Sequence, residues 1–152
     1  MHLEWTDYRR EDGKVVDSWL DGEAVAMTGL DQGWDDYWQA VRADGKHYPG
    51  CRDVCKIIRE QGQPIAAVCF GWYGGVTTVS EILVAPQRRG QGVGELILRE
   101  LIALADGWTG EKTEKFQAVI FAKNVPSQRA FEKAGFAFAY EHEGSLNYEY
   151  NV

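Results

Sequence analysis

The sequence predicts a fold of the α+β (mixed α/β) class, a mixed sheet with helices packed on it, in a single domain of residues 1–152. Two observations lead to this class. Short segments with the alternation typical of strands are spread along the chain. Helical segments separate them in the second half, where the order is strands, helix, strand, helix and two strands. The 45% apolar and 26% charged residues favour a globular core over disorder.

The N-terminal third is expected to hold one strand and one helix. Residues 2–8 alternate loosely and predict a strand, whereas residues 15–20 are too short and ambiguous to assign. Asp31 is placed to cap a helix that Asp44-Gly45 ends. The apolar side chains of this helix recur at helical spacing and form one stripe: Trp34, Tyr37, Trp38 and Val41.

Three strands are expected next. Residues 54–59 and 65–73 predict an antiparallel pair, joined by a four-residue turn at residues 61–64. Gly74-Gly75 makes the following turn, and residues 76–84 (VTTVSEILV) predict the third strand.

The second half alternates helices with strands. A long helix with an apolar stripe follows the third strand and is expected to end at Asp106-Gly107. Residues 116–121 predict a strand, and residues 124–135 predict a short helix that begins at an Asn and stops at a Gly. The final antiparallel pair is expected over residues 136–142 and 146–150.

The acidic side chains are concentrated at the N-terminus. Residues 1–45 hold 11 acidic and 4 basic side chains, and the net charge of the whole chain is −7, which argues against a nucleic-acid or anionic-membrane partner. Four of the six Trp lie in the same segment. An acidic, aromatic-rich surface suits a small amine, through charge steering and cation–π contact. The alternative is that the aromatic side chains are core and the acids a solvated face.

Other features narrow the class of protein. No apolar run approaches the roughly 20 residues that span a bilayer, and the first residues lack the apolar segment of a signal peptide. A soluble, intracellular protein of the cytoplasm is therefore expected. Cys51, Cys55, Cys69 and the three His have no metal-ligand spacing, which predicts reduced thiols and no bound metal.

The most distinctive feature is a Gly-rich turn, QRRGQGVG at residues 87–94, between the third strand and the long helix. The first N–H groups of a helix lack intrahelical partners and carry a partial positive charge, and glycine lets a backbone approach a ligand closely. Together they suit a phosphate or pyrophosphate, with Arg88 and Arg89 adding charge at the mouth. The G-x-G-x-G spacing matches neither the dinucleotide fingerprint nor the nucleotide P-loop. A purely structural tight turn is the alternative.

Two segments, VSEILVAPQRRGQGVGELILRELIALA and NVPSQRAFEKAGF, resemble the two signature motifs of the GNAT superfamily of acyl-CoA-dependent N-acyltransferases. The first matches Gln/Arg-x-x-Gly-x-Gly/Ala at residues 87–92, and the second matches at Asn124, Ser127 and Phe131 before a Gly-Phe pair. The resemblance covers residues 54–142, the acyl-CoA-binding core. Residues 1–50 match only as the variable segment on the acceptor side.

The resemblance implies a GNAT-like mixed, mostly antiparallel, V-shaped sheet flanked by helices. Acetyl-CoA lies in the opening of such a sheet, here between the strands 76–84 and 116–121. Main-chain N–H groups that bind the pyrophosphate are implied for Arg89, Gly90, Gln91, Gly92, Val93 and Gly94. Main-chain pairing with the pantetheine arm is implied for Ile82, Leu83 and Val84. The Val84 N–H is expected to polarise the thioester carbonyl. Asn124 and Ser127 are expected to contact the CoA arm, although Asn124 alternatively serves only as a helix cap.

The reaction implied is transfer of the acetyl group from acetyl-CoA to a primary amine of a small molecule or peptide, by direct attack in a ternary complex. An amine with a pKa of about 10 is mostly protonated at pH 7, so a base must take its proton. Glu81 is the candidate. Strand alternation puts Glu81 and Leu83 on one face and Ile82 and Val84 on the other, unless a bulge intervenes. Ser80 and Thr78 are alternatives that hold a proton-carrying water.

Phe131 departs from the family pattern, since many members carry there a Tyr that protonates the leaving thiolate. Tyr140, Tyr148 and Tyr150 are substitute candidates, or the thiolate of a thiol with a pKa near 8.5 leaves unaided. A non-catalytic CoA-binding regulatory or interaction module is the alternative function, and a longer acyl donor is a further one.

One hypothesis, which rests on composition alone, places the acceptor pocket along the acidic and aromatic helix near the N-terminus. Its candidate lining residues are Asp31, Trp34, Asp35, Asp36, Tyr37 and Trp38. The alternative is again that the aromatic side chains are core and the acids a solvated face. A homodimer is compatible with the resemblance, but no residue pattern predicts it.

Overall fold

The computed structural model describes all residues from Met1 to Val152. The strands are β1 (Glu4–Asp7), β2 (Arg52–Glu60), β3 (Gln63–Tyr73), β4 (Val76–Val84), β5 (Lys115–Phe121), β6 (Ala137–His142) and β7 (Ser145–Asn151). The α-helices are α1 (Gly13–Asp17), α2 (Gly22–Thr28), α3 (Trp34–Gly45), α4 (Val93–Thr109) and α5 (Val125–Lys133). Two short 3₁₀ turns, η1 (Arg10–Asp12) and η2 (Pro86–Arg88), precede α1 and α4.

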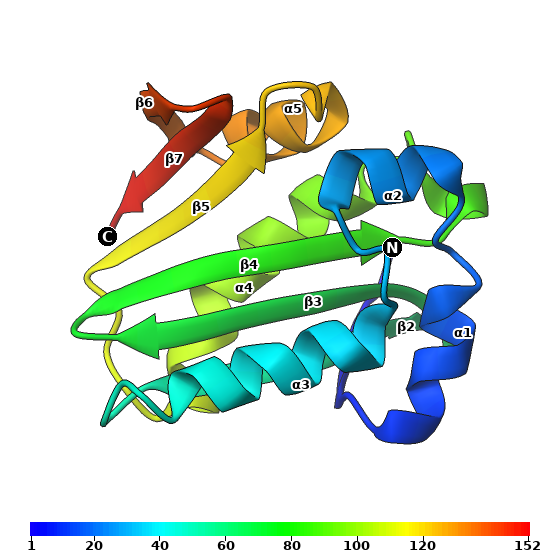
Figure 1. Ribbon diagram of the computed structural model, residues 1–152, viewed down its shortest axis with the longest axis horizontal. Helices are drawn as coiled ribbons and strands as arrows, with labels where there is room; N and C mark the ends of the chain where they lie inside the picture. The colour runs from blue at the N-terminus through cyan, green and yellow to red at the C-terminus, as the bar shows by residue number, and fades with distance from the viewer.

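All seven strands form one sheet in the order β1-β2-β3-β4-β5-β7-β6 (Figure 1). Every neighbouring pair is antiparallel except β4 and β5, which are parallel. The α+β class and the mixed, mostly antiparallel sheet are thus confirmed. The chain contains no helix with the length and apolar character needed to cross a bilayer.

The sheet opens between its two parallel strands. β4 and β5 pair only from Val76–Val79 against Lys115–Ala118, and beyond these residues the two strands diverge (Figure 1). This is the V-shaped opening that the sequence resemblance implied. Main-chain groups of both strands beyond the last pair are therefore free of the partner strand, at the C-terminal ends where β4 runs toward the Gly-rich turn.

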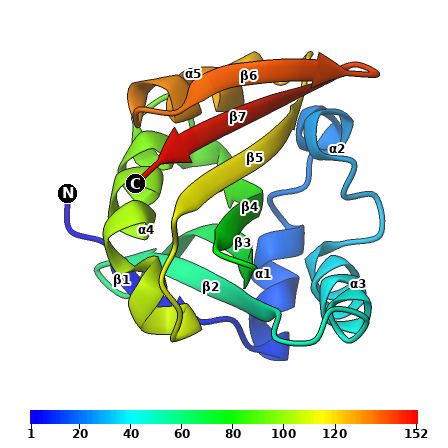
Figure 2. The same ribbon diagram turned by 90° about the vertical axis from the view of Figure 1, so that its left-hand side faces the viewer.

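Helices cover both faces of the sheet (Figure 2). α4 and α5 pack on one face, where Ile97, Leu101 and Phe131 belong to a core cluster of 19 buried residues. α1, α2 and α3 cover β2–β4 on the other face, where Val16 and Trp34 belong to a cluster of 11 buried residues. β3 lies between the two clusters, which explains why its central residues form a continuous apolar run instead of an alternating one.

Two boundaries differ from the sequence prediction. β2 and β3 are joined by a two-residue turn, Gln61-Gly62, with both residues at positive φ (50° and 79°), so the turn residues expected at 63–64 lie in β3. Such a turn matches the twist of a hairpin better than a longer loop does. α4 continues through Asp106-Gly107 to Thr109, because the Trp108 ring packs on Trp5 with the ring centroids 4.7 Å apart.

The N-terminal helices also differ from expectation. Asp31 does not cap α3; the Trp34 N–H instead donates to Asp17 Oδ1 at 2.8 Å, a partner distant in sequence. The sequence did not predict α2. The Asp21 side chain caps this helix through the Ala24 N–H at 2.8 Å, and Gly29 ends it at a φ of 75°.

Candidate active site

A β-bulge in β4 determines which side chains face the opening of the sheet. Val79 pairs with Phe70 and Glu81 pairs with Cys69, so Ser80 is the extra residue. Directly opposite residues share a face, and Cys69 and Leu83 both belong to the core under α1–α3. Glu81 and Leu83 therefore lie on that face, and Ile82 and Val84 lie on the other, as the alternation indicated.

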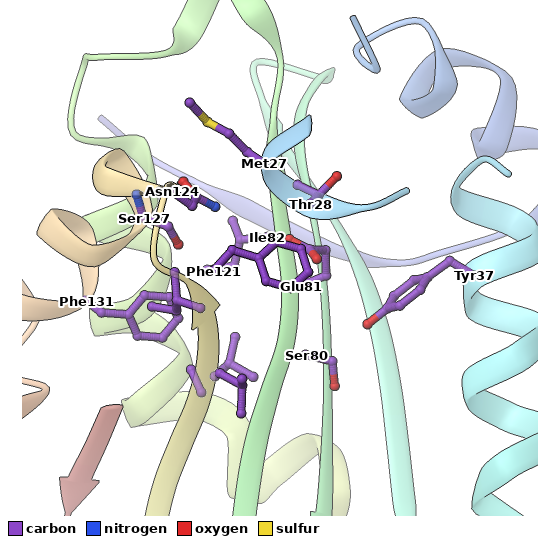
Figure 3. Close-up of a pocket in the computed structure, with 14 residues that line it drawn as sticks. Met27, Thr28, Tyr37, Ser80, Glu81, Ile82, Phe121, Asn124, Ser127 and Phe131 are labelled. Atoms are coloured by element: carbon purple, nitrogen blue, oxygen red, sulfur yellow. Dashed lines mark hydrogen bonds between the residues drawn. The ribbon is translucent and has the colours of Figure 1, made fainter. Parts of the chain in front are cut away.

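Glu81 lies in a pocket of about 230 Å³, which we call the inner pocket, between the diverging ends of β4 and β5 (Figure 3). The Phe121 ring enters it from β5 and the Tyr37 ring from α3, with the Glu81 carboxyl group between them. The remaining lining residues are Met27, Thr28, Val79, Ser80, Ile82, Ala118, Val119, Ile120, Asn124, Ser127 and Phe131.

The surroundings of Glu81 keep its carboxyl group protonated to an unusually high pH. Burial, which disfavours the charged form, raises the pKa of Glu81 to about 8, and the Ile82 backbone N–H opposes this shift. Burial also raises the pKa of Tyr37, so its phenol stays protonated and able to donate a hydrogen bond. A carboxyl group with a pKa near neutrality is suited to exchanging protons with a substrate.

A larger groove of about 500 Å³, the outer groove, runs from the inner pocket to the start of α4. α2 forms one wall, α5 forms the other, and the end of β4 and the Gly-rich turn form the floor. The inner pocket and the outer groove are continuous, since six residues line both: Met27, Thr28, Ile82, Asn124, Ser127 and Phe131.

The Gly-rich turn presents a row of free N–H groups at the floor of the outer groove. Gly90 and Gly92 have φ values of 73° and 79°, which an L side chain rarely adopts, and a Cβ on either would meet nothing within 4 Å. The N–H groups of residues 90–95 have no backbone acceptor, whereas the Arg89 N–H donates to Pro86 O at 3.3 Å. The run of free N–H groups therefore begins at Gly90, and Arg89, which was expected to contribute its N–H as well, does not belong to it.

Gly94 lies where α4 meets α5, since a Cβ there would lie 3.4 Å from Ala130 Cβ, at van der Waals contact. The backbone conformation of the turn therefore requires glycine at 90 and 92 but not at 94.

The two arginines of the turn do not project freely at the mouth of the groove. Arg88 Nη1 donates to Glu60 Oε1 at 2.6 Å, and Arg89 Nη1 donates to Asp21 Oδ2 at 3.0 Å. Both guanidinium groups therefore hold the turn in place. The basic side chains that sequence reasoning missed are Arg129 and Lys133, which line the groove from α5.

The hydrogen-bond pattern of β4 identifies which main-chain groups face the opening. The Ala85 N–H donates to Ile65 O on β3 at 2.8 Å. Because the direction alternates along an antiparallel ladder, Leu83 also turns its N–H and C=O toward β3. Ile82 and Val84 turn theirs to the open side. Of the three residues expected to offer main-chain groups to a ligand, Leu83 therefore offers none.

The second motif places Asn124 and Ser127 in both cavities. Asn124 also caps α5, with its Oδ1 accepting the Ser127 N–H at 3.3 Å. Phe131 is buried and packs edge-to-face on Phe136 at a centroid distance of 4.9 Å.

None of the three tyrosines expected to replace a catalytic Tyr lines either cavity. The Tyr148 hydroxyl donates to Glu132 Oε1 at 2.9 Å, Tyr150 packs on Phe136, and Tyr140 is exposed on β6. Tyr37 is the tyrosine in the site.

Most of the α3 side chains that were expected to line an acceptor pocket lie outside the inner pocket. Of these acidic and aromatic side chains, only Tyr37 lines it. Trp34 is fully buried and donates to Cys55 Sγ at 3.3 Å, and Asp35 accepts the Tyr8 hydroxyl at 2.8 Å. The stripe is core and the acids lie outside the pocket, which is the alternative considered for this segment.

Sequence reasoning missed the lining residues on α2 and at the end of β5: Met27, Thr28, Val119 and Phe121. Asp21 and Gly29, which begin and end α2, were the signals that could have revealed the first pair. Val119 and Phe121 could not be identified from the sequence, because it does not show where the parallel strands β4 and β5 separate.

The family comparison agrees with this fold. A family model described as the acetyltransferase (GNAT) family matches residues 2–136, so the chain belongs to the GNAT acetyltransferase family. No curated protein matches the sequence significantly.

Solved structures share the fold at low sequence identity. An acetyltransferase from Thermus thermophilus has a TM-score of 0.77 at 18% identity, covering 100% of this chain and 98% of its own. The aminoglycoside acetyltransferase AAC(6′)-Ib, in complex with coenzyme A and kanamycin, has a TM-score of 0.73 at 19% identity, covering 99% and 95%. The GNAT domain of S. lividans PAT has a TM-score of 0.74 at 16% identity, covering 99% and 90%.

Proposed function

We propose that this protein is an N-acetyltransferase that binds acetyl-CoA in the outer groove and a primary amine in the inner pocket. One observation carries the proposal: Glu81, a carboxyl group with a pKa of about 8, lies in a pocket that opens into the outer groove beside Ile82. Residues 1–50 supply the acceptor side through α2 and α3, and residues 54–142 supply the acyl-CoA-binding core.

The outer groove offers binding groups in the order that a CoA molecule needs them. The free N–H groups of residues 90–94 bind the pyrophosphate, reinforced by the positive end of α4. Arg129 and Lys133 add positive charge along the α5 wall. The main chain of Ile82 and Val84 pairs with the pantetheine arm as an added strand would, and Asn124 and Ser127 contact the arm from the opposite side.

The thioester carbonyl is polarised by a main-chain N–H of β4. The N–H groups of Ile82 and Val84 both turn to the open side of β4, but the Ile82 N–H already interacts with the Glu81 carboxyl group. We therefore assign this role to the Val84 N–H, as the sequence suggested. A fixed donor at this position stabilises the negative charge that develops on the oxygen.

The chemical step is direct attack by the amine. Its nitrogen forms a bond to the thioester carbon, the carbon–sulfur bond breaks, and the nitrogen's proton passes to the Glu81 carboxylate. An amine with a pKa of about 10 gives up its proton more readily to a carboxylate with a raised pKa than to an ordinary one. Phe131 has no hydroxyl to offer, so CoA leaves as a thiolate, which a thiol pKa of about 8.5 permits.

Two measurements test the proposal. Acetyl-CoA is expected to raise the melting temperature of the protein, and Gly92→Glu is expected to abolish that rise. Gly62→Glu is the matched control, because Gly62 also has a φ of 79° and open space around it but lies in the β2–β3 turn. An equal loss of the rise in both variants would contradict the assignment of the pyrophosphate site to the Gly-rich turn.

Thiol release from acetyl-CoA with a panel of primary amines tests the transfer step. Release that depends on an amine supports the transferase. Binding of acetyl-CoA without release across the panel favours the alternative, a CoA-binding module without turnover.

A further inference from the structure

The inner pocket carries information about the acceptor, and the inference below rests on the proposed transferase function. Nine of its 14 lining residues are hydrophobic. Glu81 is the only acidic residue among them, and no Lys, Arg or His is present. The pocket can therefore pair with one positively charged group of a ligand, and it offers no partner for a negatively charged group.

The β5 wall of the pocket is apolar and accessible. Val119 is 55% exposed and Phe121 is 42% exposed, although both side chains are hydrophobic. Their neighbours on the strand, Ala118 and Ile120, point into the core. An apolar surface that is open at a cavity and lies beside a titratable group is characteristic of a small-molecule site.

We propose that the acceptor is a primary monoamine whose body is apolar and uncharged, with its nitrogen at Glu81 and its body packed on Val119 and Phe121. The Tyr37 ring and Met27 close the space on the side of α3 and α2. The volume of about 230 Å³ is smaller than the roughly 300–1,000 Å³ of pockets for drug-sized ligands, which fits a small amine.

The same lining disfavours two other kinds of amine. An α-amino acid would bring its carboxylate to within two bonds of the reacting nitrogen, beside Glu81, where no cation can pair with it. A polyamine or amino sugar would bring further ammonium groups that have no second carboxylate in the pocket.

Four acceptors separate these classes: 2-phenylethylamine, L-phenylalanine amide, L-phenylalanine and spermidine. CoA thiol release is measured at pH 9 with saturating acetyl-CoA. The first two are expected to show kcat/KM values at least about tenfold above the last two, because an unpaired buried charge is costly. L-phenylalanine amide differs from L-phenylalanine only in replacing the carboxylate with a neutral group, so this pair isolates the effect of charge.

Two substitutions test the β5 wall. Phe121→Ala is expected to raise KM for 2-phenylethylamine about tenfold while the melting shift with acetyl-CoA persists. Phe138→Ala is the control, since Phe138 is a 54% exposed aromatic on β6 outside both cavities. Val119→Arg supplies the missing cation and is expected to move the preference toward L-phenylalanine.

Each remaining outcome overturns the inference. Preference for L-phenylalanine or spermidine would leave the transferase intact and refute the apolar acceptor. Acetyl-CoA binding without release by any amine would refute the transferase and the inference with it. If Phe121→Ala changed the oligomeric mass measured by sedimentation and altered KM equally for all four amines, a second copy of the chain, and not the acceptor, would cover Val119 and Phe121.

Discussion

Arg89 joins the Gly-rich turn to the end of β4, since its Nε donates to the Val84 carbonyl oxygen at 3.1 Å. The same guanidinium group donates to Trp19 O at 2.9 Å and to Asp21 Oδ2 at 3.0 Å. Asp21 caps α2, so the Arg89 side chain links the turn and the strand that form the floor of the outer groove to the helix that forms one of its walls. Arg89 also occupies one of the two lone pairs of the Val84 carbonyl oxygen, so the second lone pair and the Val84 N–H remain for a ligand.

Replacing Arg89 is expected to disorder the groove before it unfolds the protein. Arg89→Met removes all three of these hydrogen bonds while keeping much of the side-chain volume. Because the group is partly exposed, the expected loss is about 1–2 kcal/mol in the free energy of unfolding, together with an increase of roughly tenfold in Kd for acetyl-CoA. Urea unfolding and calorimetric titration measure the two effects.

Arg10→Met is the control for that experiment. The Arg10 side chain is 90% exposed, and its Nε lies 3.9 Å from Asp35 Oδ2, which is a long and weak ion pair. If Arg89→Met lost stability but bound acetyl-CoA with unchanged affinity, the link between Arg89 and the groove would be wrong.

Glu81 is expected to set the pH dependence of the reaction. With a pKa of about 8, its carboxyl group is mostly protonated at pH 7 and cannot accept a proton from the amine. The kcat/KM of the wild type should therefore rise about tenfold per pH unit or more below pH 8, where the amine must also be deprotonated. Glu81→Gln should lower kcat by about 10²–10⁴-fold, the usual contribution of a general base.

Thiol-release kinetics from pH 6 to 10 measure both effects, with the acetyl-CoA melting shift as evidence of an intact groove. Activity of Glu81→Gln near that of the wild type would assign proton transfer to a water held by Ser80 or Thr78.

The same group predicts how stability changes with pH. In the unfolded chain a glutamate loses its proton near pH 4.5, whereas Glu81 in the folded protein keeps it until about pH 8. Between these values the folded state holds more protons, so this group's contribution to stability is complete below pH 4.5 and is lost as the pH rises through 8. The loss amounts to at most about 1.4 kcal/mol per pH unit.

Glu81→Gln should therefore gain stability relative to the wild type as the pH rises from 5 to 8.5. Urea unfolding at both values tests this, with Glu141→Gln as a control at an exposed carboxylate. A difference between Glu81→Gln and wild type that stays constant with pH would show that the pocket does not perturb Glu81.

Local patterns were sufficient to predict the strands and the long helix. The strand β4 has the bounds that its alternation predicted, and the stripe of α3 was identified from helical spacing. The failures involve partners distant in sequence. Asp17, and not Asp31, accepts a hydrogen bond from the Trp34 N–H in the first turn of α3. The helix α4 extends past Gly107, where Trp108 packs on Trp5. A window of local residues contains neither contact.

The site divides along the same line. The Gly-rich turn could be found from sequence, because its chemistry lies in consecutive backbone groups. The inner pocket could not, since Phe121 faces Glu81 only through the separation of β4 and β5, and α2 closes it through the link between Asp21 and Arg89. The acidic and aromatic residues of α3 suggested a ligand-binding surface, but the Trp34 side chain is fully buried in the core.

Asn124 combines two functions that substitution can separate. Its Oδ1 caps α5 through the Ser127 N–H, and its side chain lines both cavities. Serine is an equally good cap but lacks the amide group. The free energy of unfolding of Asn124→Ser should therefore lie within about 0.5 kcal/mol of the wild-type value, whereas that of Asn124→Ala should be about 1 kcal/mol lower. If the amide also binds the CoA arm, both variants should raise Kd for acetyl-CoA by roughly 2–10-fold, the effect of one hydrogen bond. Wild-type affinity in Asn124→Ser, combined with weaker binding in Asn124→Ala, would reduce Asn124 to a cap that positions Ser127.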